Sequence, residues 1–185
     1  LREYERTAEL SLHVAETPKE AQEIFDKLVQ LHQKEWMKRG RPGAFANRYM
    51  LDFHRKLIAD RFPKQEIQLV DVSSGPHTIG CLYNLVYQGH VLFYQSGFQY
   101  RPENIFRPGL VCHTLAVMHN AAMGFRSYDF LAGEGKYKQS LSTDYRKMQD
   151  ILIQKKKVKY KIENNVGNLY RLMKKRSGDG QTEPA

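Results

Sequence analysis

The chain has 185 residues, a length that suits one ordinary domain with a core of its own. Hydrophobic residues make up 41% of it and charged residues 26%, as in soluble globular proteins. No apolar run reaches the roughly eighteen residues that a transmembrane helix needs, so a membrane span is excluded. The net charge of +9 comes largely from basic runs near the C-terminus. Such runs favour a solvated surface, or attraction of an anionic substrate, over a nucleic-acid interface.

Cysteine and histidine usage narrows the class further. Cys81 and Cys112 lie within apolar patterns, which predicts two buried thiols in a reducing compartment and hence a cytoplasmic protein. The histidines show no metal-ligand spacing, so no metal site is predicted. The first residues have neither an initiator methionine nor a signal-peptide pattern. We interpret them as the continuation of an earlier segment of a longer protein.

The first third of the chain predicts an edge strand and two helices. Residues 10–14 alternate in polarity, as a strand does. Thr17 and Pro18 are typical of a helix start, and the helix that follows stops near Gly40. A basic turn at 39–43 leads into a second helix that ends before Pro63. The predicted apolar side of this second helix consists of Phe45, Tyr49, Phe53, Leu57 and Ile58.

The remainder predicts strands before and after a central helix. Residues 66–72, 78–86 and 91–98 form three consecutive antiparallel strands, with a hairpin turn at Gln88 and Gly89. A helix over 110–123, a buried strand over 128–131, a strand over 146–154, a helix over 163–175 and a disordered tail over 177–185 follow. The order predicts an α+β (mixed α/β) fold, with a mostly antiparallel twisted sheet flanked by helices.

This order of elements resembles the GNAT fold. The motifs along it resemble the C-terminal half of the CelD/BcsL-like acetyltransferases, a family linked to envelope or extracellular polysaccharide synthesis and related to the Fem peptidoglycan aminoacyl transferases. The match spans residues 20 to 155. The matching residues are Leu31, His32, Trp36, Arg39, Gly40, Gly43, Ala44, Phe45, Phe53, His54, Tyr94, Gly97, Phe98, Pro108, Gly109, Gly124, Tyr128 to Leu131, Gly133, Glu134, Tyr137 and Lys138.

The resemblance implies both a domain plan and an activity. Because family members carry two GNAT-like halves in tandem, residues 1–18 are expected to be a linker and edge strand from a preceding half. Residues 19–176 are then the acyltransferase domain, and residues 177–185 are the tail. The implied activity is N-acyl transfer from acetyl-CoA or another acyl-CoA to an amine on an amino sugar or envelope precursor. The acceptor is a small molecule, lipid-linked or a nucleotide sugar, and dimerisation is left open.

One segment departs from the GNAT pattern Gln/Arg-x-x-Gly-x-Gly/Ala that precedes the central helix, since only Arg107 and Gly109 match it. Arg107, Gly109 and Leu110 still offer a cation and free N–H groups to a phosphate, and an ordinary proline-started helix is the alternative. The departure favours a second hypothesis. In it the chain is a non-catalytic, substrate-binding half of a Fem-like transferase that uses aminoacyl-tRNA or another donor.

Four residues are predicted to be catalytic. Glu134, in the glycine-rich loop after the last central strand, is a candidate base, and Lys138 can supply positive charge, as the resemblance to Fem-like enzymes also implies. Asp129 is a candidate base with a raised pKa, or is tied to a backbone N–H or to Arg126. His54 can reach the acceptor cleft, or is a hydrogen-bonded helix residue.

Seven further residues complete the predicted site. Tyr94, Gln95 and Ser96 lie near the end of the central strand, where the GNAT fold exposes backbone to the donor, and they are predicted to bind it together with Arg107, Gly109 and Leu110. The residues predicted to bind the acceptor are Trp36, Arg39, Phe45 and Tyr137.

Overall fold

The computed structural model describes residues 4, 6, 8–101, 106–133, 135–147, 149, 151, 153 and 155. The chain divides into two compact units, Leu1–Tyr145 and Arg146–Ala185, and the architecture below is that of the first. In the segment 146–154, where a strand was expected, the described residues 146, 147, 149, 151 and 153 are not in a strand, and the other four lie outside the described residues. The helix expected over 163–175 and the tail lie wholly outside them.

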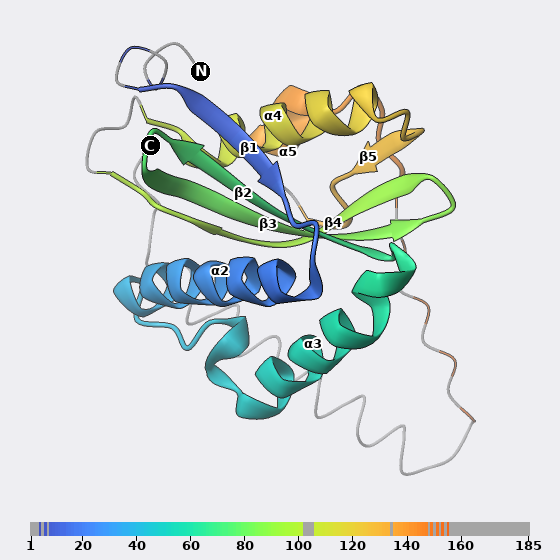
Figure 1. Ribbon diagram of the computed structural model, residues 1–185. Coiled ribbons are helices and arrows are strands. Elements are labelled where there is room, and N and C mark those ends of the chain that lie inside the picture. Colours follow the sequence, from blue (N-terminus) through green and yellow to red (C-terminus); the bar gives the residue numbers. More distant parts are fainter. Residues whose placement is uncertain are drawn as a thin grey trace, which may run out of the picture. The chain divides into compact units, whose positions relative to one another are not determined.

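A five-stranded sheet forms the centre of the first unit (Figure 1), in the order β1 (Leu10–Val14), β2 (Ile67–Ser74), β3 (His77–Tyr87), β4 (His90–Phe98) and β5 (Ser127–Asp129). The first four strands are antiparallel, and β5 runs parallel to β4. The predicted edge strand and antiparallel meander are confirmed. At the β3–β4 turn, Gln88 and Gly89 have φ angles of 49° and 78°, as a tight turn that matches the strand twist requires.

Helices cover both faces of this sheet (Figure 1). Helix α2 (Pro18–Lys38) and helix α3 (Arg48–Arg61) lie on one face, while α4 (Pro108–Ala122) and the short α5 (Lys136–Leu141) lie on the other. The start of α2 is as predicted, because the Thr17 hydroxyl accepts a hydrogen bond from the Glu20 N–H at 3.2 Å and Pro18 occupies the first turn. Short 3₁₀ turns, Ala44–Ala46 and Phe62–Lys64, flank α3.

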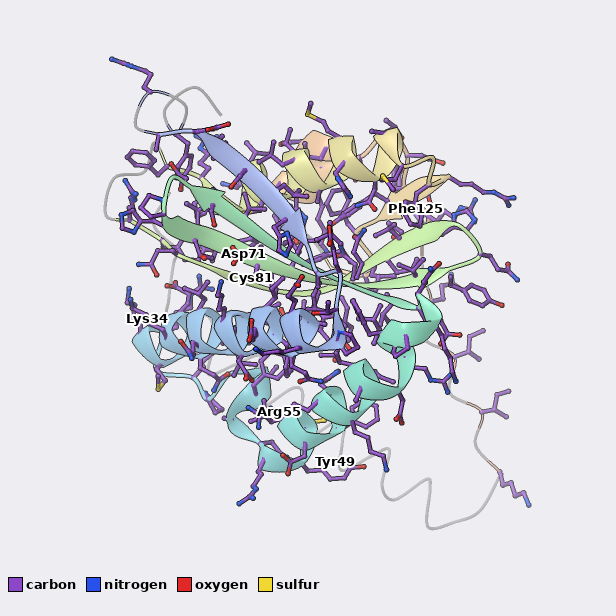
Figure 2. All side chains as sticks on the ribbon, viewed as in Figure 1. Lys34, Tyr49, Arg55, Asp71, Cys81 and Phe125 are labelled. Carbon is purple, nitrogen blue, oxygen red and sulfur yellow. The ribbon has the colours of Figure 1, made fainter. Side chains whose placement is uncertain are left out.

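The two faces of the sheet have separate hydrophobic cores. The core under α2 and α3 includes Phe25, Leu28 and Tyr83, and the core under α4 includes Leu82 and Phe93. Each contains one free, buried cysteine, Cys81 in the first and Cys112 in the second, which confirms the predicted burial. Figure 2 shows Cys81 beside Asp71, its partner across β2 and β3. The five-stranded sheet with helices on both faces confirms the predicted mixed α+β class.

Gly97 allows α2 to lie directly on β4. A Cβ at this position would overlap the carbonyl oxygen of Leu28 and meet the Cβ of Leu31 at 2.9 Å. Because a backbone oxygen cannot move aside as a side chain can, Gly97→Ala is expected to destabilise the domain by about 1–3 kcal/mol. Urea unfolding measures this loss. Ser96→Ala, at the next position on the strand, is the control, and equal stability of both variants would contradict the prediction.

Two predicted elements differ in detail. Phe45 belongs to the 3₁₀ turn before α3, and Tyr49 and Phe53 point to solvent, with 74% and 47% of their surface exposed (Figure 2 labels Tyr49). The buried residues of α3 are Ile58, as predicted, and His54, which takes an inward position that an apolar residue was expected to fill. The predicted buried strand over 128–131 is shorter, ending at Asp129, and both of its ends are exposed.

Candidate active site

Strand β4 is paired along one side only over most of its length. Strand β5 pairs with residues His90 to Leu92, at the beginning of β4. Among the described residues, the stretch from Phe93 to Phe98 has no strand neighbour on that side. Apart from Ser96, whose N–H and C=O groups contact the side chains of Gln95 and His32, its outward backbone groups lack a strand partner in the described structure, and a ligand that enters between β4 and β5 could take that place.

The free stretch of β4 begins with a bulge. Asn84 on β3 pairs with Phe93, but the preceding residue Tyr83 pairs with Gln95, so Tyr94 is the extra residue on β4. A bulge turns side chains out of the regular alternation and often lies next to an active site. Here it directs Tyr94 towards α3, where the Tyr94 hydroxyl lies 3.0 Å from Nε2 of His54.

His54 is held in a buried aromatic cluster. Its ring lies 5.6–5.8 Å from those of Tyr83 and Phe45 and 5.1 Å from that of Tyr94. Only 3% of His54 is exposed, whereas 39% of Tyr94 is. Burial lowers the pKa of His54 and raises the pKa of Tyr94, so both groups are neutral near pH 7. The partly exposed Tyr94 side chain thus has its hydroxyl held by a neutral imidazole.

A second buried histidine lies on the opposite face, beside the gap between β4 and β5. The ring of His113, on α4, lies 4.5 Å from that of Phe93 and 5.3 Å from that of Phe130, and it is stacked on Tyr137 at 4.9 Å. Its Nδ1 lies 3.2 Å from the Tyr128 hydroxyl. His113 therefore contacts residues from both sides of the gap.

The first turn of α4 is the third feature of this region. Arg107 caps the helix without a side-chain hydrogen bond, so the first N–H groups of α4 have no side-chain acceptor from the cap residue. Packing alone can explain the glycine at position 109, because a Cβ there would lie 3.2 Å from the Phe98 ring. Close packing of α4 on β4 therefore requires a small residue at this position, with or without a ligand.

The sequence profile of the acetyltransferase (GNAT) domain matches residues 1–139, which is most of the chain. The chain belongs to the GNAT acetyltransferase family. A comparison with curated proteins found no match.

Solved structures agree with this assignment at the level of the fold. The GNAT domain is similar to an aminoglycoside acetyltransferase from an uncultured soil metagenomic sample in complex with trehalose (TM-score 0.51, 12% identity, 80% of this chain and 97% of that one). It is also similar to a GCN5-related N-acetyltransferase from Ralstonia eutropha (TM-score 0.50, 11% identity, 78% and 99%). At these identities the similarity shows the shared fold. The narrower CelD/BcsL-like resemblance stays a prediction.

The structure brings together part of the predicted site of this GNAT domain. His54, Tyr94 and Phe45 lie in one cluster, although they were predicted for three different roles. Trp36 and Arg39 contact each other at the end of α2, where Arg39 also pairs with Glu35 at 2.9 Å.

The other predicted donor-site residues make backbone contacts of their own. Gln95 accepts a hydrogen bond from the Ser96 N–H at 3.0 Å, and the Ser96 carbonyl lies 3.1 Å from Nδ1 of His32. Leu110 is partly buried, and its carbonyl accepts a hydrogen bond from Thr114 at 2.8 Å.

Two predicted catalytic carboxylates have different outcomes. Asp129 is exposed rather than buried, and its carboxylate accepts a hydrogen bond from the Leu131 N–H at 2.7 Å. The interpretation of Asp129 as a desolvated base is therefore wrong, and the backbone alternative holds, because β5 leaves this position at the surface. Glu134 lies outside the described residues, and its role stays a prediction.

Lys138 binds the loop that precedes it. Its Nζ donates hydrogen bonds to the carbonyl oxygens of Phe130 at 2.8 Å and Ala132 at 2.7 Å, and lies 3.5 Å from that of Leu131. Leu131 has a φ of 55°, a conformation that a residue with a side chain seldom adopts. The ammonium group thus stabilises a strained turn, and a catalytic role stays a prediction.

Removal of this ammonium group is expected to loosen the turn. Lys138→Met keeps the length of the side chain but loses the charged hydrogen bonds, and we expect about 1–2 kcal/mol of lost stability in urea unfolding. Lys136→Met, on the exposed side of α5, is the matched control. The prediction fails if the two variants unfold at the same urea concentration.

Sequence reasoning missed the buried polar residues on the α4 face. The four residues are Gln68, Asn84, His113 and Asn120, and all of them are buried. Tyr128 links the three amides to His113. One signal was present in the sequence, because His113 and Asn120 are seven residues apart and therefore lie on the same face of a helix. An apolar helix with two polar residues on its inward face indicates a buried hydrogen-bond network.

Two kinds of feature are absent from the described residues. No helix in this part of the chain is long and apolar enough to cross a membrane. Nor does the described part contain a group of three or more His, Cys, Asp or Glu residues that could hold a metal ion.

Proposed function

We propose that this GNAT domain transfers an acetyl or other acyl group from acyl-CoA to an amine on a small acceptor. The proposed acceptor is an amino sugar or a precursor of the envelope or an exopolysaccharide. One observation carries the proposal: the Tyr94 hydroxyl, at a bulge beside the unpaired stretch of β4, is held by the buried His54.

The residues around β4 fit an acyl-CoA. The edge of β4 from Phe93 to Phe98, which has no strand neighbour in the described structure, suits the amide-containing arm of the cofactor, because such an arm can pair with a strand edge. The first turn of α4, with Arg107 at its cap, suits the phosphates. Nε2 of His113 is a buried polar atom with no partner in the described structure, as expected where a ligand supplies one.

The Tyr94–His54 pair suits the stabilisation of negative charge. Bound acyl-CoA supplies a thioester, whose carbonyl carbon the amine attacks and whose C–S bond then breaks. We assign the Nε2–H of His54 as donor to the Tyr94 oxygen, which leaves the hydroxyl proton of Tyr94 free to donate. A fixed neutral donor of this kind favours the charge that develops on an acyl oxygen, and neither residue has to ionise.

The amine proton requires a separate acceptor. His54 is poorly suited, because burial disfavours its charged form. Glu134, which stands between two glycines in the sequence, remains our candidate for the base.

The acceptor side carries exposed aromatic residues. Tyr49 and Phe53 lie on the same face of α3, one helical turn apart and next to His54, and both are exposed. Such rings provide an apolar platform for the flat face of a sugar. One of the similar structures is an aminoglycoside acetyltransferase with trehalose bound, which supports an amino sugar as acceptor.

A second candidate function is a non-catalytic half of a Fem-like transferase. The departure of residues 101–110 from the GNAT phosphate motif favours it, and so does the packing explanation for Gly109. Under this alternative, Tyr94 and His54 contribute to acceptor binding alone.

Calorimetric titration of the full chain with acetyl-CoA separates the two candidates. We expect saturable binding, followed by release of free CoA thiol when a panel of amino sugars is added. Acetyl-CoA that produces no heat would contradict the acyl-CoA proposal and favour the non-catalytic one. Binding without turnover of any amine would retain the donor and refute only the acceptor class.

A further inference from the structure

A chain of buried hydrogen bonds joins four elements on the α4 face and ends at His113. The Asn120 amide nitrogen donates to the Ala116 carbonyl at 2.8 Å, and the Gln68 amide nitrogen donates to Oδ1 of Asn120 at 2.9 Å. The Asn84 amide nitrogen donates to Oε1 of Gln68 at 2.9 Å. We call this chain, continued through Tyr128 to His113, the relay.

The far end of the relay sets the direction of all its bonds. A backbone carbonyl only accepts, so the contact with Ala116 fixes which end of the Asn120 amide carries its nitrogen. Each amide then fixes the next one, and Oδ1 of Asn84 is left as an acceptor that faces the Tyr128 hydroxyl at 3.3 Å. The single hydroxyl proton of Tyr128 is used in that bond.

The direction of the relay determines the tautomer of His113. Because the Tyr128 oxygen donates its proton to Asn84, it can only accept from Nδ1 of His113, 3.2 Å away. Nδ1 therefore carries the hydrogen, and Nε2 has a bare lone pair. Burial and the nearby charge of Lys138 lower the pKa of His113 to about 3, so the ring does not gain a second proton near neutral pH.

The ring that carries this lone pair lies beside the two ends of the proposed donor site. No surface of His113 is exposed, and its Nε2 has no hydrogen-bond partner among the described residues. The ring lies beside Phe93 at the start of the free stretch of β4, and beside Phe98 at its end, with a centroid separation of 6.0 Å in the second case. Since Nδ1 is directed at Tyr128 on β5, Nε2 points away from that strand.

We propose that Nε2 of His113 accepts a hydrogen bond from an amide N–H or the hydroxyl of the pantetheine arm of the acyl-CoA donor, and that the relay holds His113 in the required tautomer. This inference rests on the proposed acyl-CoA donor. The arm offers three such donor groups and no cation, which matches a neutral acceptor in an aromatic cage. An acceptor that is kept unpaired in the free protein makes its bond at little reorganisation cost when the arm enters.

Access to Nε2 requires a neighbouring element to move, because the His113 ring is fully buried, and α5 is our candidate. Tyr137, on this helix, covers the imidazole face at an interplanar angle of 4°. Helix α5 has only six residues, and none of them is buried. A short, exposed helix of this kind is among the elements that move most easily in a domain.

The first test reads the histidine directly. Nitrogen-15 NMR of the labelled full chain reports the protonation of each ring nitrogen, and His113→Phe identifies the signal. We expect a protonated Nδ1 and a bare Nε2 in the free protein, and an upfield shift of Nε2 upon addition of acetyl-CoA. Addition of 3′,5′-ADP, which lacks the arm, should leave Nε2 unshifted. An Nε2 that is protonated in the free protein overturns the inference.

The second test uses binding. His113→Phe keeps the stacked ring and removes the acceptor, so we expect acetyl-CoA affinity to fall about tenfold and 3′,5′-ADP affinity to stay the same. Tyr128→Phe is the second variant, since it frees the tautomer without touching His113, and it should produce a protonated Nε2 signal together with weaker binding. His119→Gln, on the same helix, is the matched control.

The outcomes separate this inference from the proposed function. If acetyl-CoA binds to the wild-type chain but neither shifts Nε2 nor discriminates between wild type and His113→Phe, the role of His113 is refuted and the acyl-CoA donor stands. If acetyl-CoA does not bind at all, both proposals are overturned.

Discussion

Tyr94→Phe is expected to lower kcat for acyl transfer by about 10²–10³-fold, with acetyl-CoA affinity unchanged. The substitution removes the hydroxyl of the Tyr94–His54 pair, which is the proposed donor, and leaves the ring in its cluster. The loss of a single preorganised donor to a developing negative charge has an effect of this size. Steady-state kinetics with the best amine of the panel, together with calorimetry for acetyl-CoA, measures both quantities.

His54 is expected to act through Tyr94. His54→Phe keeps an aromatic ring in the buried cluster and removes the imidazole nitrogen that orients the hydroxyl, so we expect a smaller loss of kcat, about tenfold. If His54 works only through Tyr94, the double variant should be no slower than Tyr94→Phe alone. Losses that multiply in the double variant would show that His54 has a role of its own.

Tyr83 provides the matched control for this series. Its hydroxyl is buried and makes no hydrogen bond among the described residues, and its ring packs 5.4 Å from that of Tyr94. Tyr83→Phe therefore removes a hydroxyl from the same cluster without breaking a bond, and we expect unchanged kcat and equal or higher stability. A loss of activity in Tyr83→Phe comparable with that in Tyr94→Phe would assign the effect to packing instead.

The second large effect concerns stability in acid. Burial lowers the pKa of His113 to about 3 from its ordinary 6.5, so the unfolded chain binds a proton at His113 before the folded chain does. Stability from this group is fully present above pH 6.5 and is lost as the pH falls from there towards 3. Between pH 7.5 and pH 5 we expect the free energy of unfolding to drop by about 2 kcal/mol through His113 alone.

Urea unfolding of wild type and His113→Phe at the two pH values isolates this contribution. The wild-type loss also contains smaller losses of the same sign from His32 and His54, whose pKa values burial also lowers. The variant keeps those and lacks only the His113 contribution, so its loss should be smaller by about 2 kcal/mol. Equal losses in the two proteins would mean that the folded state accommodates a charged His113.

The amino-acid sequence by itself determined the elements, because these depend on local patterns. Thr17 and Pro18 mark the start of α2, Gln88 and Gly89 mark the hairpin turn, and the alternation in residues 66–98 marks the antiparallel meander. Capping, turn conformation and periodicity each depend on a few neighbouring residues, so the local sequence is enough to predict them. The order of elements was enough to indicate the GNAT fold.

Tertiary structure alone decided which side chains meet. His54 and Tyr94 are forty residues apart, and their contact depends on a bulge that appears only when the register of β3 against β4 is known. Asp129 looked buried because its neighbours are apolar, yet β5 ends at that residue and leaves it exposed. The tautomer of His113 depends on bonds from β2, β3, β5 and α4 together. Such long-range contacts follow from packing and register, which local sequence patterns do not encode.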